Sequence, residues 1–453
     1  MRAKLSLGCY LQNIYNEYQG EKMIGIFERD VPALVLRDPD LIKDVLIKDF
    51  SVFPNRPVFY HEKSEPLSEH LFALHSSKWR PLRTKLSPAF TTNKLKHMFN
   101  WMLESSERFE KYLETLAKKN EPIESRDIMI RYTIDVIGYC AFGLNTKTMS
   151  DEKNEFCQMG HKIFRNEFIT YLRIRVSQVP WLYNIIGRLF ADRDIEEFFI
   201  RLTMETLDYR KRNNIRRDDV MDILVDIKDQ KKIDDFDITK SLLASQVLLF
   251  FAAGFETTSS MMSNAMYELA LNHTIQDKLR QEIKEVLKST NGKITYEGIK
   301  ELKYMEAFIR ETLRKYPPLM YLVRRSLADY NFRGTDITIP KKTKVFIPIY
   351  GIQHDPNIYP KPEVFDPDRF TEELMKSRDP MFFLAFGDGP RNCMGKSFAY
   401  NEIKIGFIKI LQNYLVDVCE KTPSPPYPLN MQDQMILQPD CGLYVQLTPI
   451  STC

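Results

Sequence analysis

The chain reads Phe386-Gly387-Asp388-Gly389-Pro390-Arg391-Asn392-Cys393-Met394-Gly395 near its C-terminal end, which fits the pattern F-x-x-G-x-R-x-C-x-G. At ordinary residue frequencies, five fixed positions recur by chance in roughly one chain of this length in ten thousand. A cysteine thiolate is a metal ligand, and Cys393 precedes a helical pattern over 396–414, whose N-terminus favours negative charge. Gly389 and Gly395 let the backbone approach a bound group, because they lack a Cβ. The stretch predicts a metal-ligating cysteine; the alternative, a structural cysteine beside a turn, does not account for the pattern.

The composition excludes several classes of protein. The chain has 453 residues and a net charge of +3, with its basic residues scattered. This balance argues against a nucleic-acid partner, which would require massed positive charge. Seven cysteines, an odd number without a C-x-x-C pair, argue against a disulfide framework, a zinc site or an iron–sulfur cluster. They favour a reducing compartment.

The periodicity of apolar residues predicts a mainly α fold with a small β subdomain. Helical patterns cover 93–118, 128–142, 194–213, 238–271, 275–290 and 304–316. Short strand patterns lie at 24–27, 34–36, 332–333, 345–348 and 443–448. No repeat or low-complexity linker divides the chain, so we expect one continuous unit.

The sequence as written shows no pattern of a membrane span or signal peptide. Residues 1–20 hold Arg2, Lys4 and Glu17 among short apolar runs. The longest uncharged stretch, 241–255, is too short to cross a bilayer. We expect the chain to be soluble or peripheral to a membrane.

The cysteine stretch resembles the haem-ligand loop of the cytochrome P-450 family, the haem-thiolate monooxygenases. Further motifs follow in the family's order from Trp79 to Gly395, so the resemblance covers essentially the whole chain. It implies the cytochrome P-450 fold, with residues 1–453 as a single haem-containing catalytic domain and haem b (iron protoporphyrin IX) as cofactor. Cys393 would be the axial thiolate on the iron, with Phe386, Arg391 and Gly395 around the haem. Such a thiolate favours O–O cleavage.

A second motif, Glu311-Thr312-Leu313-Arg314, places a carboxylate and a guanidinium on one helix face. E-x-x-R alone is common in helices, but here Phe365-Asp366-Pro367-Asp368-Arg369-Phe370 follows downstream. The resemblance implies that Glu311, Arg314 and Arg369 lock together behind the cysteine loop, a structural role. An arginine fork can hold a carboxylate through two bonds, which lysine cannot.

A third motif, Ala253-Gly254-Phe255-Glu256-Thr257-Thr258, lies inside the longest helical pattern. Glycine followed by threonine favours a kink, because a threonine hydroxyl can bond the carbonyl of the preceding turn. The resemblance implies that Glu256 and Thr257 are catalytic and deliver protons to iron-bound dioxygen. The alternative is a packing glycine in a core helix.

Four residues match positions that seat the haem in the family. Trp79 and Arg83 are four apart and share a helix face. The resemblance implies that they, Arg391 and Arg324 face the haem propionates, with Arg324 preferred to its neighbour Arg325. Two buried carboxylates require such partners, because an unpaired buried charge is costly.

Two surfaces are expected to contact partners. Basic residues near the cysteine side would dock an acidic flavoprotein by charge complementarity; they are Lys78, Arg80, Lys85, Lys396 and Lys404. The segment 164–199, with Pro180-Trp181-Leu182-Tyr183 at its centre, would roof the substrate cavity and contact a membrane surface. The alternatives are a solvated charged face and an ordinary amphipathic helix.

The resemblance implies a microsomal monooxygenase, most like the insect class that oxidises hormones, plant toxins and insecticides. One atom of O2 would enter a small lipophilic substrate (a xenobiotic, hormone or fatty-acid-like molecule), and the other would become water. Because the chain has no dinucleotide fingerprint, electrons would come from NADPH–cytochrome P-450 reductase, with cytochrome b5 as a second donor. We expect a monomer at the cytosolic face of the endoplasmic reticulum membrane, although the family's N-terminal anchor is absent from the sequence as written.

Two alternatives remain open at this point. A haem-thiolate isomerase or dehydratase would need no reductase, although Glu256 and Thr257 argue against it. A haem-binding protein without turnover is the other. The sequence leaves the substrate open, because many chemistries share one fold.

Overall fold

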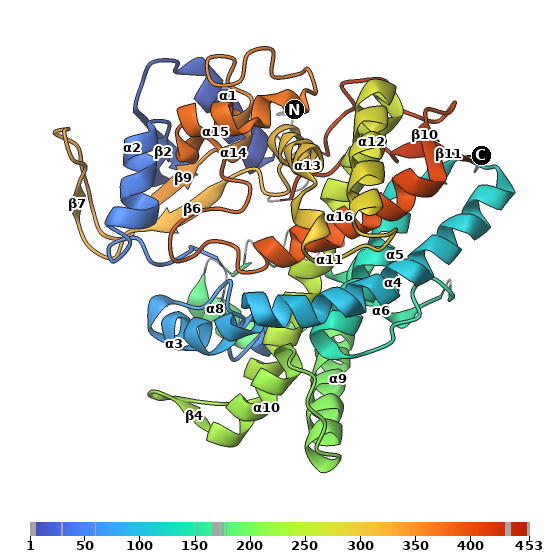
Figure 1. Cartoon of the computed structure of the whole chain (residues 1–453). Coiled ribbons are helices and arrows are strands. Elements are labelled where there is room, and N and C mark those ends of the chain that lie inside the picture. Colours follow the sequence, from blue (N-terminus) through green and yellow to red (C-terminus); the bar gives the residue numbers. More distant parts are fainter. Residues whose placement is uncertain are drawn as a thin grey trace.

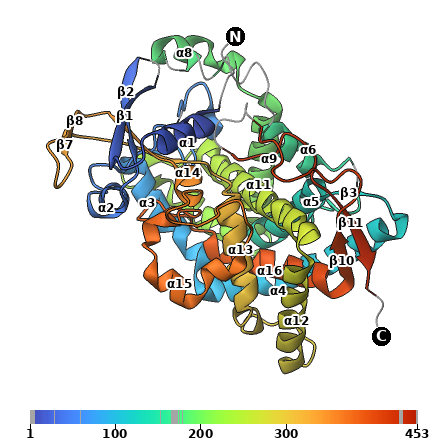
Figure 2. The same ribbon diagram turned by 90° about the horizontal axis from the view of Figure 1, so that it is seen from above.

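The computed structural model describes residues 6–28, 30–58, 60–151, 153–164, 173, 176–177, 179–430 and 436–450. Its longest helix, α11 (Lys240–Leu271), runs through the middle of the molecule and is surrounded by other elements (Figures 1 and 2). Most side chains of α11 are buried on every side, as expected of a helix at the centre of a core. This helix alone, among the described residues, is long and apolar enough to cross a membrane, and most of its apolar window is buried inside the fold.

The other helices pack around α11, and four small sheets complete the fold (Figure 1). The helices are α1 (Leu7–Glu17), α2 (Pro39–Lys43), α3 (Ser76–Leu86), α4 (Thr92–Lys119), α5 (Ser125–Ile137), α6 (Glu155–Ile163), α8 (Pro180–Ile186), α9 (Arg193–Arg212), α10 (Val220–Gln230), α12 (His273–Ser289), α13 (Lys303–Lys315), α14 (Ile349–Gln353), α15 (Glu372–Ser377) and α16 (Lys396–Asn413). The strands are β1 (Met23–Glu28), β2 (Val31–Leu36), β3 (Ile123–Glu124), β4 (Lys232–Ile233), β5 (Phe236–Asp237), β6 (Leu322–Arg325), β7 (Tyr330–Asn331), β8 (Thr338–Ile339), β9 (Lys344–Ile347), β10 (Tyr414–Asp417) and β11 (Tyr444–Pro449).

The largest sheet has the order β1-β2-β9-β6. The hairpin β1–β2 is antiparallel, β2 runs parallel to β9, and β9 pairs antiparallel with β6. An isolated bridge between Asn55 and Arg325 joins the edge of β6 to the loop before α3. This sheet therefore brings Arg324 of β6 beside the loop that carries Arg56.

The six predicted helices are confirmed within a few residues, with 138–142 continuing α5 as a π-helical turn. The predicted strand at 332–333 is wrong, because β7 ends at Asn331. Phe332 instead turns inward, where it is fully buried against Phe53 and Tyr330, and Gly334 continues the turn at φ +71°. Burial of the aromatic ring, rather than strand pairing, explains the apolar signal there. Part of the segment 164–199 lies outside the described residues.

Candidate active site

The cysteine loop is a tight turn that ends at the N-terminus of α16. The Cys393 N–H donates to the carbonyl of Phe386 at 2.9 Å, and the Asn392 N–H donates to that of Gly389 at 3.0 Å. Gly389 has φ +71°, and a Cβ there would lie 1.9 Å from the carbonyl oxygen of Leu46. Glycine is therefore required at position 389 by the backbone conformation and by the close approach of Leu46. The expected reason was different, namely the approach of the backbone to a bound group.

Two observations together indicate that the Cys393 thiol faces a space inside the fold. Its side chain is accessible, yet burial within the protein raises the pKa of the thiol. A thiol can be both accessible and poorly hydrated when its accessible surface lies inside the protein. A hydrogen bond from the Gly395 N–H and the charges of Arg83, Arg56 and Lys396 act the other way and lower that pKa. The sulfur therefore sits where positive charge and a backbone donor favour a thiolate.

Four arginines from four separate segments form a cluster near the cysteine loop: Arg56, Arg83, Arg324 and Arg391. The charges of Arg56 and Arg83 act on the thiol, and those of Arg324 and Arg391 act on Arg56. Burial lowers the pKa of each, and mutual repulsion lowers those of Arg56 and Arg391 further. In the part of the chain that the structure describes, no ion pair joins any of the four to a carboxylate. Such a cluster suits an anionic ligand, since buried charges require partners.

The predicted residues Arg391 and Trp79 contact each other. The Arg391 guanidinium lies 4.2 Å from the centre of the Trp79 ring, an arrangement that favours a cation. It also donates to the carbonyls of Pro54 and Leu74, each at 2.8 Å. Arg391 thereby ties the cysteine loop to the chain before α3.

Arg324 and Arg83 make fewer hydrogen bonds than Arg391. Arg324 is buried and donates to the carbonyl of Val323 at 3.0 Å, and within the described part of the chain its Nε has no hydrogen-bond partner. Burial lowers its pKa to about 10. Its neighbour Arg325 is only partly buried, which supports the choice of Arg324. Arg83 donates to the carbonyl and side chain of Asn392, each at 3.2 Å.

Arg56 belongs to the cluster but was missed by the sequence reasoning. It donates to the carbonyl of Arg391 at 2.9 Å and stacks on Phe72 at 4.2 Å. No spacing marks Arg56, since an arginine followed by proline is common in loops. Its position follows from Asn55, whose side chain accepts from the Ser76 N–H at 2.8 Å.

An accessible thiol beside four arginines suits a group that carries a metal and two carboxylates. The orphaned Nε of Arg324 offers a donor to such a carboxylate. The residues present therefore fit haem b, whose iron Cys393 would ligate and whose propionates the arginines would face.

The middle of α11 carries the predicted catalytic residues Glu256 and Thr257. Ala253 is exposed and Thr257 partly exposed within this otherwise buried helix. The segment remains α-helical, and the Thr257 hydroxyl donates to the Ala253 carbonyl at 2.9 Å. Gly254 is needed for packing, because a Cβ there would lie 2.7 Å from Ile137 of α5.

Glu256 is buried and turned toward α5 and the C-terminal loop. Its Oε1 accepts from Arg126 at 2.5 Å and from Gln438 at 3.0 Å. No hydrogen bond joins Glu256 to Thr257 in the described structure. Neither Arg126 nor Gln438 was predicted as a partner of Glu256, because both are distant from the motif in sequence.

The predicted trio of Glu311, Arg314 and Arg369 comes together in the core. Arg314 holds both oxygens of Glu311, at 2.7 and 2.8 Å, and the Nε of Arg369 lies 3.5 Å from Glu311 Oε1. Gln353, to which the sequence assigned no role, donates to the carbonyls of Leu313 and Arg314 and accepts from the Leu384 N–H. Gln353 thus links α13 to the chain that leads into the cysteine loop.

The predicted basic surface is smaller than expected. Lys404 is buried, where it donates to the carbonyl of Ile299 at 2.9 Å. Lys78 is paired with Glu69 at 2.7 Å and with Glu62. The remaining residues, Arg80, Lys85 and Lys396, are exposed.

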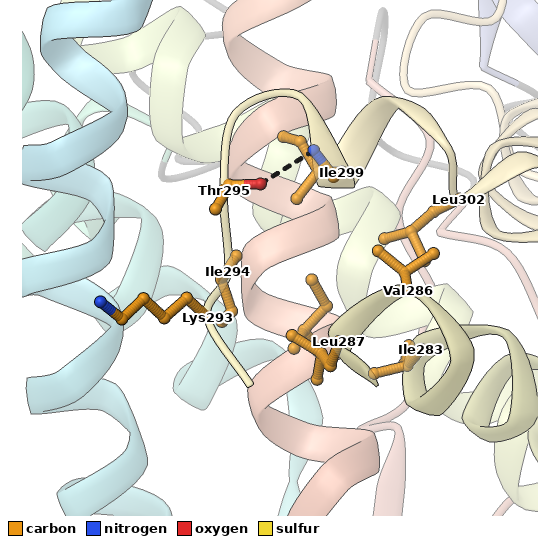
Figure 3. Close-up of a pocket in the computed structure, with 10 residues that line it drawn as sticks. Ile283, Val286, Leu287, Lys293, Ile294, Thr295, Ile299 and Leu302 are labelled. Atoms are coloured by element: carbon orange, nitrogen blue, oxygen red, sulfur yellow. Dashed lines mark hydrogen bonds between the residues drawn. The ribbon is translucent and has the colours of Figure 1, made fainter. Parts of the chain in front are cut away.

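A small pocket elsewhere lies between α12 and the loop at 293–302 (Figure 3). Its walls are mainly apolar, including Ile283, Leu287 and Ile299, and its volume of about 10 Å³ holds at most one water. Thr295 in its wall accepts a hydrogen bond from the Gly298 N–H at 3.0 Å. We regard this pocket as a packing defect.

The fold and the thiol–arginine site define a haem-thiolate protein. The profile of the cytochrome P450 family matches residues 5–446, and the chain belongs to that family. Cytochrome P450 6A1 of Musca domestica is 39% identical over 433 residues, covering 94% of this chain and 85% of the relative. Cytochrome P450 6a2 of Drosophila melanogaster is 38% identical over 429 residues (92% and 85%). Cytochrome P450 6k1 of Blattella germanica is 37% identical over 443 residues (93% and 84%).

Membership of this family establishes the function at the level of chemistry. The chain is a monooxygenase that binds haem through a cysteine thiolate, acts on a lipophilic substrate and receives electrons from a redox partner. The two alternatives, an isomerase or dehydratase and a haem binder without turnover, are not supported.

Proposed function

We propose that Cys393 is the axial ligand of the haem iron and that residues 1–453 act as one catalytic domain. The observation that carries this proposal is the accessible Cys393 thiol beside four arginines without carboxylate partners in the described structure. Of the described cysteines, Cys9, Cys140 and Cys157 are buried, and Cys419 and Cys441 are partly buried.

The haem, when bound, supplies the oxidation of the substrate by dioxygen, and the chain's side chains hold and orient the reactants. Arg56, Arg83, Arg324 and Arg391 would neutralise the propionates, and Trp79 would support Arg391 from its ring face. Phe386 and Gly395 would shape the loop around the sulfur. Glu311, Arg314 and Arg369 would keep that loop in place, with Gln353 as the link.

Thr257 and Glu256 would handle protons on the opposite side of the site. The Thr257 hydroxyl has an acceptor in the Ala253 carbonyl and lies on the accessible face of α11. The Glu256 carboxylate is held by Arg126, whose side chain is partly exposed. Protons would reach Thr257 when the Glu256 carboxyl leaves Arg126 and turns toward the accessible face of the helix.

We further propose NADPH–cytochrome P-450 reductase as the electron donor, with cytochrome b5 as a second donor, and a monomeric enzyme. Arg80, Lys85 and Lys396 would form the docking surface, since exposed positive charge steers an acidic partner. Charge reversal of Lys85 should slow electron transfer more at low salt than at high salt.

A membrane contact is proposed on one edge of the molecule. Trp181, Ile185 and Leu189 are 67, 70 and 76% exposed. Figure 2 shows α8 at the same edge as the β1–β2 hairpin, where Phe27 is 69% exposed. Large apolar side chains with a tryptophan suit a membrane surface. This edge would place the enzyme at the cytosolic face of the endoplasmic reticulum, and replacing Trp181 and Leu189 by serine should abolish flotation with phospholipid vesicles.

The experiment that tests the catalytic proposal is reconstitution with reductase and NADPH under labelled dioxygen. With a library of lipophilic compounds, the wild-type protein should incorporate one labelled atom per product molecule. Cys393→Ala should give no product, whereas Cys419→Ala should retain activity. Product from Cys393→Ala would contradict the assignment of the ligand.

A further inference from the structure

His70 lies in a tight turn that joins α11 to the arginine cluster. The N–H groups of Ala73 and Leu74 both donate to the His70 carbonyl at 3.0 Å. On one side of the turn, the Leu71 N–H donates to Gln246 of α11 at 2.9 Å. On the other side, Arg391 donates to the Leu74 carbonyl at 2.8 Å. The turn is therefore fixed at both ends.

His70 is partly accessible and lies in the turn that contacts α11 through Gln246. Loss of hydration, with a contribution from the charge of Arg56, nevertheless lowers the pKa of its imidazole to about 4. Gln246 and Ala253 are seven residues apart, so they lie on the same face of α11, about 10 Å apart along its axis. The exposed Ala253 thus lies on the face of α11 that contacts the His70 turn through Gln246.

The two ring nitrogens of His70 are in different situations. Nδ1 accepts from the Ala73 N–H at 3.3 Å, so in the neutral ring the hydrogen is on Nε2. In the described part of the chain no hydrogen bond uses Nε2. Buried side-chain nitrogens without a partner do not include Nε2, so this atom is accessible. His70 therefore offers one free, accessible N–H donor.

We propose that His70 determines substrate specificity by donating its Nε2–H to an uncharged acceptor oxygen of the lipophilic substrate, such as that of a ketone, ester or ether. This inference rests on the proposed function, and it places the substrate between the His70 turn and the accessible face of α11 at Thr257. A neutral imidazole does not compensate a buried carboxylate, and the neighbouring arginines would be engaged by the haem. The acceptor is therefore an uncharged oxygen.

The test compares two ligands that differ in one acceptor oxygen, 4-phenylcyclohexanone and phenylcyclohexane. Their dissociation constants are measured on the haem-loaded protein by titration of the Soret absorption. We divide the dissociation constant of phenylcyclohexane by that of 4-phenylcyclohexanone. This ratio should fall roughly tenfold in His70→Phe, which corresponds to about 1.4 kcal/mol for one hydrogen bond. His70→Gln, which keeps an N–H near the position of Nε2, should retain the wild-type ratio.

Two outcomes would overturn the inference. One is a ratio in His70→Phe within twofold of wild type; the other is a ratio in His70→Gln as low as in His70→Phe. The absorption spectrum of each reduced protein with carbon monoxide separates this test from the proposed function. If the thiolate band is present and the ratio does not change, only the role of His70 fails. If the wild-type protein lacks that band, the proposed function fails and this inference fails with it.

Discussion

Arg126 donates to Glu256 Oε1 at 2.5 Å, which joins the first turn of α5 to the centre of α11. The Glu256 side chain is buried, whereas the Arg126 side chain is 20% exposed. The acid predicted to deliver protons is therefore anchored toward a partly exposed cation, and Gln438 is its second donor.

Removing either partner of this pair should destabilise the protein, because it leaves the other charge without compensation. We expect Arg126→Met to lower the unfolding free energy by about 2 kcal/mol, less than the loss of a fully buried pair because Arg126 is partly exposed. Glu256→Gln should recover part of this loss in the double variant. Urea unfolding of the two single variants and the double variant measures the coupling; strictly additive effects would contradict the pairing.

Gly389 should not tolerate alanine. Its φ of +71° and the Leu46 carbonyl both oppose a Cβ. Gly334 has the same φ and nothing within 4 Å of the added Cβ, so it is a matched control. Gly334→Ala should cost about 1 kcal/mol from backbone strain, and Gly389→Ala should cost several times more and reduce haem content. Equal losses in thermal denaturation would show that contact with Leu46 is unimportant.

Arg314→Lys should fail to replace arginine. Lysine cannot bind both oxygens of Glu311 and also the carbonyls of Gln353 and Pro362. Because the Glu311–Arg314 pair is fully buried, we expect a loss of about 3–5 kcal/mol and little haem-loaded protein. As a control, Arg310→Lys, which alters an i,i+4 pair with the partly exposed Glu306, should change stability by less than about 1 kcal/mol. Haem per polypeptide and the melting temperature check both variants.

Stability should fall as the pH falls from 6.5 toward 3, in part through His354. Burial, with the charge of Arg314, lowers the pKa of His354 from 6.5 to about 3. Between these values the unfolded chain binds a proton that the folded protein does not, so each pH unit costs about 1.4 kcal/mol. His354→Gln should make the pH dependence shallower by that slope, whereas His161→Gln at an exposed position should not. Equal slopes for wild type and His354→Gln in urea unfolding at pH 5.0–6.5 would contradict the prediction.

The sequence predicted the parts of the site that lie within one motif or one helix. Apolar periodicity located α4, α9 and α11, and the i, i+3 spacing placed Glu311 against Arg314. The resemblance to the family also brought Arg369 to Glu311 and Arg391 to Trp79, but other contacts between distant segments were beyond its reach. Arg126, Gln353 and His70 carry ordinary local patterns, and their roles depend on which side chains tertiary packing places opposite them. Phe332 shows the converse, since its strand-like pattern reflects burial of a ring in a turn.

The charged residues were the hardest to assign from sequence. Lys404 belongs to a helix whose surface the sequence could not orient, and packing places its ammonium against the Ile299 carbonyl inside the fold. Arg324 was preferred to Arg325 by resemblance alone; burial and its unpaired Nε now provide a physical reason.

The most direct test of the central claim is the absorption spectrum of the dithionite-reduced protein with carbon monoxide. With Cys393 on the iron as thiolate, the Soret band should be strongly red-shifted, and Cys393→His should move it to the position typical of histidine-ligated haem. A wild-type band already at that position, or a red-shifted band that survives in Cys393→His, would contradict the assignment.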